Sequence, residues 1–296
     1  MSFPSLPLAA VTPDAPSLLP QVGWLAWLTN SVFVAVVVAF IIIYATRRAT
    51  ARMQLIPGGF QNGFEAVVEF LYNQVEAIVG PKVAPRAFPL LATFFLFILI
   101  SNWMALVPGV GTVGFLKETG GYAEMTGFLT LYPEPDVPIL RPATADLNMT
   151  LGLAATFMIL WMYVTLKEMG LFGFLHHMFG PKGGLKGLMG KILIPMFLFV
   201  GVIELISIAF RPASLSLRLF GNVFAGETLL HEMAVLGQGL GAIGSFITSV
   251  LFPLPFYFFE LLIGLLQATV FALLCAVYIQ LSTTHDDHGD EHGEGH

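Results

Sequence analysis

The chain has 296 residues, of which 56% are hydrophobic and only 11% are charged, and its mean hydropathy is +0.81. This composition excludes an ordinary soluble domain and indicates a protein that crosses a membrane several times. The formal net charge of −6 says little about partners, because the last twelve residues, HDDHGDEHGEGH, hold five acids and no Lys or Arg.

Five segments are apolar and long enough, at about 1.5 Å per residue, to cross about 30 Å of hydrocarbon as helices. The predicted spans are residues 24–46, 88–107, 147–166, 192–236 and 242–281. A short glycine-rich turn joins the last two, so we expect two long C-terminal helices that form a membrane hairpin. The predicted fold class is an all-α membrane protein, with an integral membrane domain over residues 24–283.

Two segments differ in character from the spans. Residues 1–23 contain five prolines and no Lys or Arg, so they lack the charged region of a secretory signal and are expected to form an irregular leader. In residues 60–79 the apolar positions follow helical spacing and Glu65, Glu69 and Glu76 lie between them, which predicts an amphipathic surface helix. Its acidic face favours a protein partner over anionic lipid, and a solvated face explains the pattern equally well.

Lys and Arg are distributed unevenly over the connecting segments. Residues 47–87 and 167–191 hold nine of them, whereas residues 108–146, a predicted polar loop, hold two. Because cytoplasmic loops carry an excess of Lys and Arg, this count places the N-terminus outside and the C-terminus in the cytoplasm. The remaining two, Arg211 and Arg218, lie inside a predicted span.

The stretch from Arg211 to Glu227, RPASLSLRLFGNVFAGE, therefore places ionisable side chains in lipid. Arginine stays protonated at any physiological pH, and a charge near the centre of a bilayer costs at least about 3 kcal/mol. Arg218 needs a function or a partner. Intramembrane ionisable groups usually mark a transport path, and a structural ion pair with an intramembrane glutamate is the alternative.

The spacing of the polar residues suggests how they are arranged. At about 100° per residue, one broad face of their helix holds Arg211, Ser214, Arg218 and Asn222. Glu260 and Gln267 are seven residues apart on the antiparallel last helix, and thus share a face. With Gln267 level with Arg218, three groups are predicted: a mid-membrane site (Arg218, Asn222, Gln267), an outer acidic vestibule (Glu227, His231, Glu260), and one inner acid, Glu204, about 21 Å away.

These positions suggest two offset proton paths that meet at an arginine. Two of the assignments have simpler alternatives. Glu204 could be an interfacial carboxylate with no transport role, and His231 could lie in the outer headgroup zone.

The motif SLSLRLFGNVFAGE, followed by Glu260 and Gln267, resembles subunit a of F-type ATP synthases, also called ATPase subunit 6. SNWMALVPG at the end of the second span and ADLNMTLGLA at the start of the third agree with it. The resemblance covers roughly residues 24–283. It implies that Arg218 is the essential arginine that faces the carboxylates of a c-ring. The other matched positions of the proton path are Asn222, Gln267, Glu227, Glu260, Glu204 and Ser214.

The resemblance implies a subunit of the F0 proton channel that binds no nucleotide and no cofactor. Two half-channels would couple ion translocation to rotation and ATP synthesis. The implied partners are the c-ring, subunit b of the peripheral stalk, the remaining F0F1 subunits and membrane lipid, with no nucleic acid. The implied location is the bacterial cytoplasmic membrane, and the mitochondrial inner membrane is the alternative.

One departure from the family pattern concerns the outer vestibule. In some members the positions of Glu227 and Glu260 hold one histidine and one carboxylate, whereas here both are glutamate. We hypothesise that His231, one turn after Glu227, takes the part of that histidine in proton uptake.

Two other functions are alternatives to a proton-channel subunit. A secondary transporter could use Arg218 to bind an anionic solute at mid-membrane, but the two halves of the chain show no inverted repeat. A metal-handling protein is suggested by the tail, residues 284–296, which is expected to be disordered. Its candidate ligands are His285, His288, His292 and His296.

Overall fold

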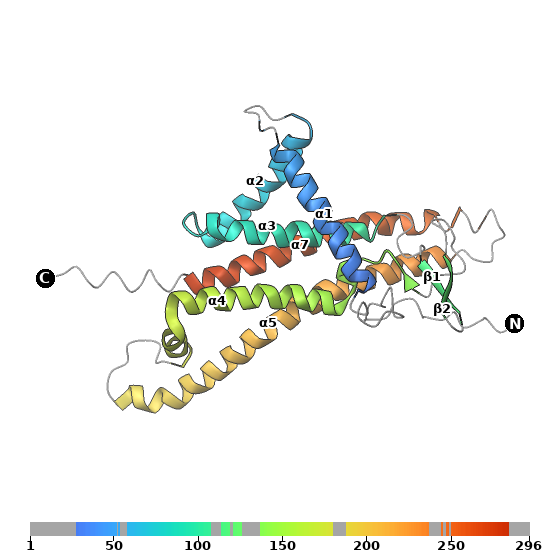
Figure 1. Ribbon diagram of the computed structural model, residues 1–296. Helices are drawn as coiled ribbons and strands as arrows, with labels where there is room; N and C mark the ends of the chain where they lie inside the picture. Colours follow the sequence, from blue (N-terminus) through green and yellow to red (C-terminus); the bar gives the residue numbers. More distant parts are fainter. Residues whose placement is uncertain are drawn as a thin grey trace.

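The computed structural model describes residues 28–51, 53, 58–107, 114–118, 121–125, 137–179, 188–236, 244, 247–248 and 250–283 (Figure 1). The predicted leader and the predicted histidine-bearing tail lie outside these residues. Five described helices are long and apolar enough to cross a membrane, which confirms the predicted fold class and number of spans. These spans are Asn30–Thr50, Ala84–Met104, Leu147–Lys167, Pro195–Met233 and Pro253–Leu281.

The first span, α1, is Asn30–Thr50. Thr29 caps it, because its hydroxyl oxygen accepts a hydrogen bond from the backbone N–H of Val32 at 3.3 Å. A threonine cap satisfies one of the four free donors of a helix start. The helix therefore begins after the predicted residue 24, at a position that apolar composition alone does not mark.

Helices α2 (Phe60–Val79) and α3 (Ala84–Met104) follow. Gly59 and Gly80, at the two ends of α2, both have positive φ angles, which glycine adopts without strain. Leu71, Val75 and Val79 form the buried stripe of α2, and the helix packs against α3 and α7 (Pro253–Thr283). The location of α2 at a membrane surface stays a prediction.

The predicted polar loop after α3 contains a small antiparallel sheet. Its strands are β1 (Gly114–Glu118), β2 (Gly121–Met125) and β3 (Val137–Pro138), in the order β2-β1-β3. These short strands show no long alternating apolar pattern, so the sequence did not reveal them. A short 3-10 helix, η2 (Ala143–Ala145), then leads into the third span.

The third span belongs to α4 (Leu147–Phe179), which is longer than predicted. Residues 167–179 were expected to belong to a loop, and that expectation was wrong. Gly170 bends the helix there with φ +69° and ψ 163°, a conformation that favours glycine. Figure 1 shows the short last part of α4 turned away from the main axis.

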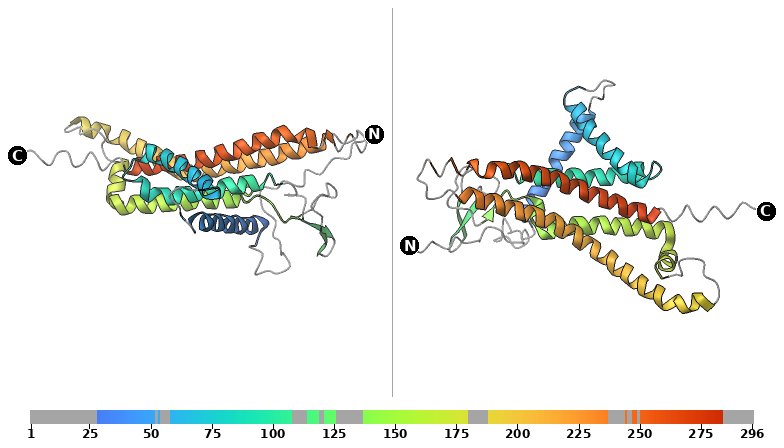
Figure 2. Two further views of the ribbon diagram at one scale, coloured as in Figure 1. Left: turned by 90° about the horizontal axis from the view of Figure 1, so that it is seen from above. Right: turned by 180° about the vertical axis from the view of Figure 1, so that it is seen from behind.

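The C-terminal hairpin consists of α5 (Leu188–Val235) and α7. Helix α5 has 48 residues and continues through Pro195 and Pro212. Its C-terminal half runs beside α7, whereas its N-terminal half diverges from α7 (Figures 1 and 2). The described part of α7 begins at Pro253, later than the predicted residue 242.

The core lies between α3, α4 and α7. The Phe94 ring of α3 meets the Phe157 ring of α4 at 6.1 Å and the Phe271 ring of α7 at 5.8 Å between centroids. Small buried residues of α7, including Ala272 and Cys275, let these helices approach closely. This packing holds α7, and with it Glu260 and Gln267, in a defined rotation.

Candidate functional site

The side chain of Arg218 lies on an exposed face of α5. Leu215, Leu219 and Val223 of α5 are buried, whereas the side chain of Arg218 is exposed. Within the described part of the chain, Arg218 makes no hydrogen bond or ion pair. The surrounding exposed positions of this face are Ser214, Leu217, Gly221, Asn222 and Ala225.

Asn222 and Gln267 connect the two helices of the hairpin. The Asn222 amide Nδ2 donates a hydrogen bond to Gln267 Oε1 at 2.8 Å, and Gln267 is only 5% exposed. Arg218, Asn222 and Gln267 were predicted to share one mid-membrane site, and the structure brings Asn222 and Gln267 into contact.

The structure brings the two outer glutamates to the same region of the hairpin. The Glu260 carboxyl group lies against the backbone of Gly226, in the space that a Cβ atom would occupy. Glu227 is the next residue, and its Oε2 is buried without a hydrogen-bond partner in the described structure. Two carboxyl groups from α5 and α7 therefore lie at one depth, as the residue numbers had suggested.

Arg141 is a site residue that was not predicted from the sequence. It precedes η2 and is only 2% exposed, although it was counted among the arginines of an outside loop. The Arg141 guanidinium and the His231 ring both lie within electrostatic range of the Glu227 carboxylate. Arg141 is 86 residues before Glu227 in the chain, and its only sequence signal is its place just before the ADLN motif.

A buried hydrogen-bond network joins α3 and η2 to the hairpin. Thr144 Oγ1 donates to Asn102 Oδ1 at 2.8 Å, and Asn102 Nδ2 donates to the backbone oxygen of Gly264 at 3.3 Å. Nearby, Trp103 Nε1 donates to the backbone oxygen of Leu261 at 3.2 Å. Thr144 and the SNW motif thus hold the turn of α7 that lies between Glu260 and Gln267.

Gly264 allows this close contact, and its replacement by valine is expected to disrupt it. A Cβ at Gly264 would lie 3.1 Å from the Asn102 Cβ, so Gly264→Val should lower the stability of the full chain by about 1–3 kcal/mol. The midpoint of thermal unfolding in detergent measures the effect. Gly152→Val is the matched control, because Gly152 is a helical glycine with open space around it. Equal losses in both variants would contradict the role of Gly264.

The remaining predicted site residues lie apart from these contacts. Glu204 is half-buried on the N-terminal half of α5, and Ser214 is exposed one turn before Arg218. Among the described residues no group of three His, Cys, Asp or Glu side chains could hold a metal ion. His285, His288, His292 and His296 lie outside the described residues.

Comparison with known proteins shows the family. Residues 28–280 match the model of a family described as ATP synthase A chain. The chain belongs to this family. Family membership confirms the resemblance seen in the sequence, and with the five apolar helices it shows a multi-pass membrane protein.

Three similar proteins cover most of the chain, and each is called ATP synthase subunit a. The protein from Mycobacterium ulcerans is 31% identical over 260 residues, which are 88% of this chain and 87% of that protein. The protein from Marinomonas sp. is 30% identical over 270 residues, 90% of this chain and 86% of that protein. The protein from Gloeobacter violaceus is 29% identical over 283 residues, 95% of each chain.

Proposed function

We propose that the chain is subunit a of an F-type ATP synthase, the static half of a rotary proton channel in the F0 sector. In this role it binds no nucleotide, and it forms two offset half-channels beside a ring of c subunits. Proton flow through the half-channels drives rotation of the ring and thereby ATP synthesis. Family membership and the open face around Arg218 support this proposal.

The observation that carries the proposal is a charged side chain on an uncovered membrane face. An unpaired arginine in hydrocarbon costs several kcal/mol, so a partner outside the described residues must offset that cost. The small residues Ser214, Gly221 and Ala225 surround Arg218, and small residues allow helices to approach closely in membranes. A c-subunit helix that carries a mid-membrane carboxylate fits this face.

The attraction between Arg218 and a ring carboxylate must be moderate. At about 4 Å and an effective dielectric constant of about 20, it amounts to about 4 kcal/mol. A neutral carboxyl group can face lipid, whereas an ionised one pays a large desolvation cost. Each c subunit must therefore load a proton before it leaves Arg218, and the fixed charge of Arg218 blocks direct proton transfer between the half-channels.

The outer half-channel would run along the contacts between α5 and α7. Protons would be taken up at Glu227 and Glu260, with Arg141 and His231 nearby, and would pass the Asn222–Gln267 pair toward the ring. After nearly a full turn they would leave beside Glu204, on the N-terminal half of α5. Ser214 lines the face along which the ring carboxylate passes.

The proposed setting is the bacterial cytoplasmic membrane, with the N-terminus outside and the C-terminus in the cytoplasm. The c-ring would cover the Arg218 face, and subunit b and the other F0F1 subunits would complete the complex. The exposed acidic side chains Glu65 and Glu69 of α2 offer a surface for one of these protein partners.

The test is to purify the full chain from its native membrane and to measure ion flux in vesicles. We expect a c-ring to co-purify with the chain, and ATP to drive proton uptake that a pH-sensitive dye reports. Transport of an anionic solute without a c-ring would instead support the rival secondary transporter. Either that result or the absence of a c-ring from an active preparation would overturn the proposal.

A further inference from the structure

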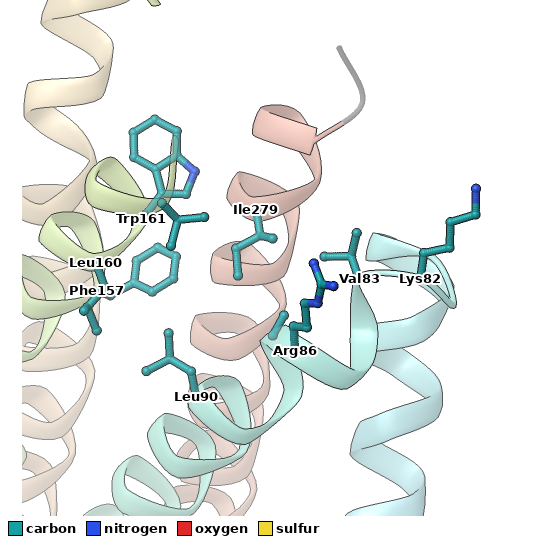
Figure 3. Close-up of a pocket in the computed structure, with 10 residues that line it drawn as sticks. Lys82, Val83, Arg86, Leu90, Phe157, Leu160, Trp161 and Ile279 are labelled. Carbon is teal, nitrogen blue, oxygen red and sulfur yellow. The ribbon is translucent and has the colours of Figure 1, made fainter. Parts of the chain in front are cut away.

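A cavity of about 270 Å³ lies between α3, α4 and α7, on the side of the bundle where α3 begins and α7 ends. Figure 3 shows Phe157, Leu160 and Trp161 of α4 on one side of it and Leu90 of α3 on another, with Ile279 of α7 between. None of these residues belongs to the proton path.

The Trp161 wall of the cavity is held in place from two directions. Its indole Nε1 donates a hydrogen bond to the backbone oxygen of Tyr278 at 2.8 Å. The Arg211 guanidinium carbon lies 5.6 Å from the Trp161 ring centroid and 4.6 Å from that of Tyr278. Cation–π contacts in a desolvated setting are strong enough to restrain both rings. Trp161 therefore does not swing in to fill the space.

The rim of the cavity carries two positive charges. Lys82 lies in the turn before α3 and Arg86 in the first turn of α3, and both side chains are exposed. In Figure 3 Arg86 extends beside Val83, and Lys82 projects outward from the rim. Within the described residues neither side chain has a carboxylate partner. Because the second span begins at Ala84, both cations lie at the end of a span, where lipid headgroups are found.

The cavity is also continuous with the outer surface of α4. Leu160 and Val164 line it and are 39% and 44% exposed, and Tyr163 beside them is exposed as well. An acyl chain could thus enter the cavity sideways from the hydrocarbon layer. A soluble anion such as phosphate would satisfy the cations but would leave the apolar cavity unfilled.

We propose that this cavity binds an anionic phospholipid. One acyl chain packs against Trp161, Phe157 and Leu90, and the headgroup phosphate is bound by Arg86, with Lys82 as a second positive charge. Basic sites between membrane helices commonly bind anionic headgroups in this way. The arginine fork also matches phosphate oxygens in geometry. The site does not depend on the proposed function, since it uses none of the residues around Arg218.

The experiment measures which lipids remain on the purified full chain. The protein is reconstituted in bilayers of equal parts phosphatidylglycerol and phosphatidylcholine and extracted with mild detergent, and the bound lipids are counted by native mass spectrometry. The wild type is expected to retain phosphatidylglycerol preferentially. Lys82→Gln with Arg86→Gln should lower that retention about tenfold, with the larger part of the loss due to Arg86→Gln. Arg86→Lys should retain most of it.

Two further variants distinguish a specific lipid-binding site from non-specific attraction between anionic lipid and positively charged side chains. Val164→Trp, at an exposed position, should fill the cavity and reduce retention of the lipid without changing the thermal unfolding midpoint. Arg47→Gln with Arg48→Gln removes the same charge from the exposed end of α1 and should leave retention unchanged.

Several results would overturn the proposal. One is that the wild type retains both lipids equally. Another is that the double variant of Lys82 and Arg86 loses no more lipid than the double variant of Arg47 and Arg48. A third is that inorganic phosphate alone releases the bound lipid. A photoreactive side chain at position 164 that captures a protein and no lipid in native membranes would show that a subunit fills the cavity. That result would also overturn the lipid proposal.

Discussion

Replacement of Arg218 by alanine is expected to abolish ATP-driven proton pumping and to leave a passive proton leak. Without the arginine, an attraction of about 4 kcal/mol for the ring carboxylate is lost, so a c subunit no longer releases its proton at this point. The barrier between the half-channels is lost as well. The measurement is ATP-driven acidification of vesicles that contain the whole complex, together with the decay of an imposed pH gradient.

Two matched variants make this result specific to Arg218. Leu217→Ala changes an exposed position of α5 next to Arg218 and should leave most of the pumping intact. Arg218→Lys keeps a positive charge but loses the planar fork of five donors, so it should pump more slowly than the wild type and leak less than Arg218→Ala. Full pumping by Arg218→Ala in a complex with an intact c-ring would contradict the proposed function.

Glu227→Gln is expected to slow proton uptake from the outer side by about 100-fold. A positioned acid or base accelerates proton transfer by about 10²–10⁴-fold, and glutamine cannot carry a proton between water and the ring. Because Glu260 lies at the same depth, Glu260→Gln should act on the same step. The double variant should then be little worse than the single ones, since residues that act as a unit are not additive.

The control for this prediction is Glu232→Gln, which removes an exposed acid five residues further along α5. Proton flux through this variant should match the wild type at every pH. Arg141→Gln and His231→Ala test the two neighbours of Glu227. Each should slow the flux and change its pH profile, whereas Arg141→Lys should restore the profile. An unchanged flux and pH profile in His231→Ala would remove His231 from the path.

The hairpin illustrates what could be predicted about the site. Arg218, Asn222 and Gln267 stood out because polar groups are rare in apolar spans, where they are expensive. The shared depth of Glu227 and Glu260 followed from adding residue numbers along two antiparallel helices. The grouping of Asn222 with Gln267 was predicted as well, but the hydrogen bond between them was not, because helix rotation depends on packing against α3 and α4.

Arg141 is the clearest example of a site residue that cannot be identified from the sequence. In the sequence it resembles any other arginine of a polar, proline-bearing loop, and a loop arginine is normally solvated. In the structure it is buried within electrostatic range of Glu227. Asn102 was visible only as part of a motif and Thr144 not at all, and their hydrogen bonds to each other and from Asn102 to Gly264 link segments far apart in the chain.

The sequence by itself determined that this is a multi-pass membrane protein with five segments long and apolar enough to cross, and that Arg218 needs a partner. Both conclusions rest on properties of single segments: a span must satisfy its own backbone hydrogen bonds across about 30 Å of hydrocarbon, and a charge within it must be compensated. Only the tertiary structure decided that the side chain of Arg218 is exposed, that Asn222 donates a hydrogen bond to Gln267, and that Arg141 lies within electrostatic range of Glu227. Those facts depend on how several helices pack together, and the periodicity of one helix does not specify the rotation of its neighbours.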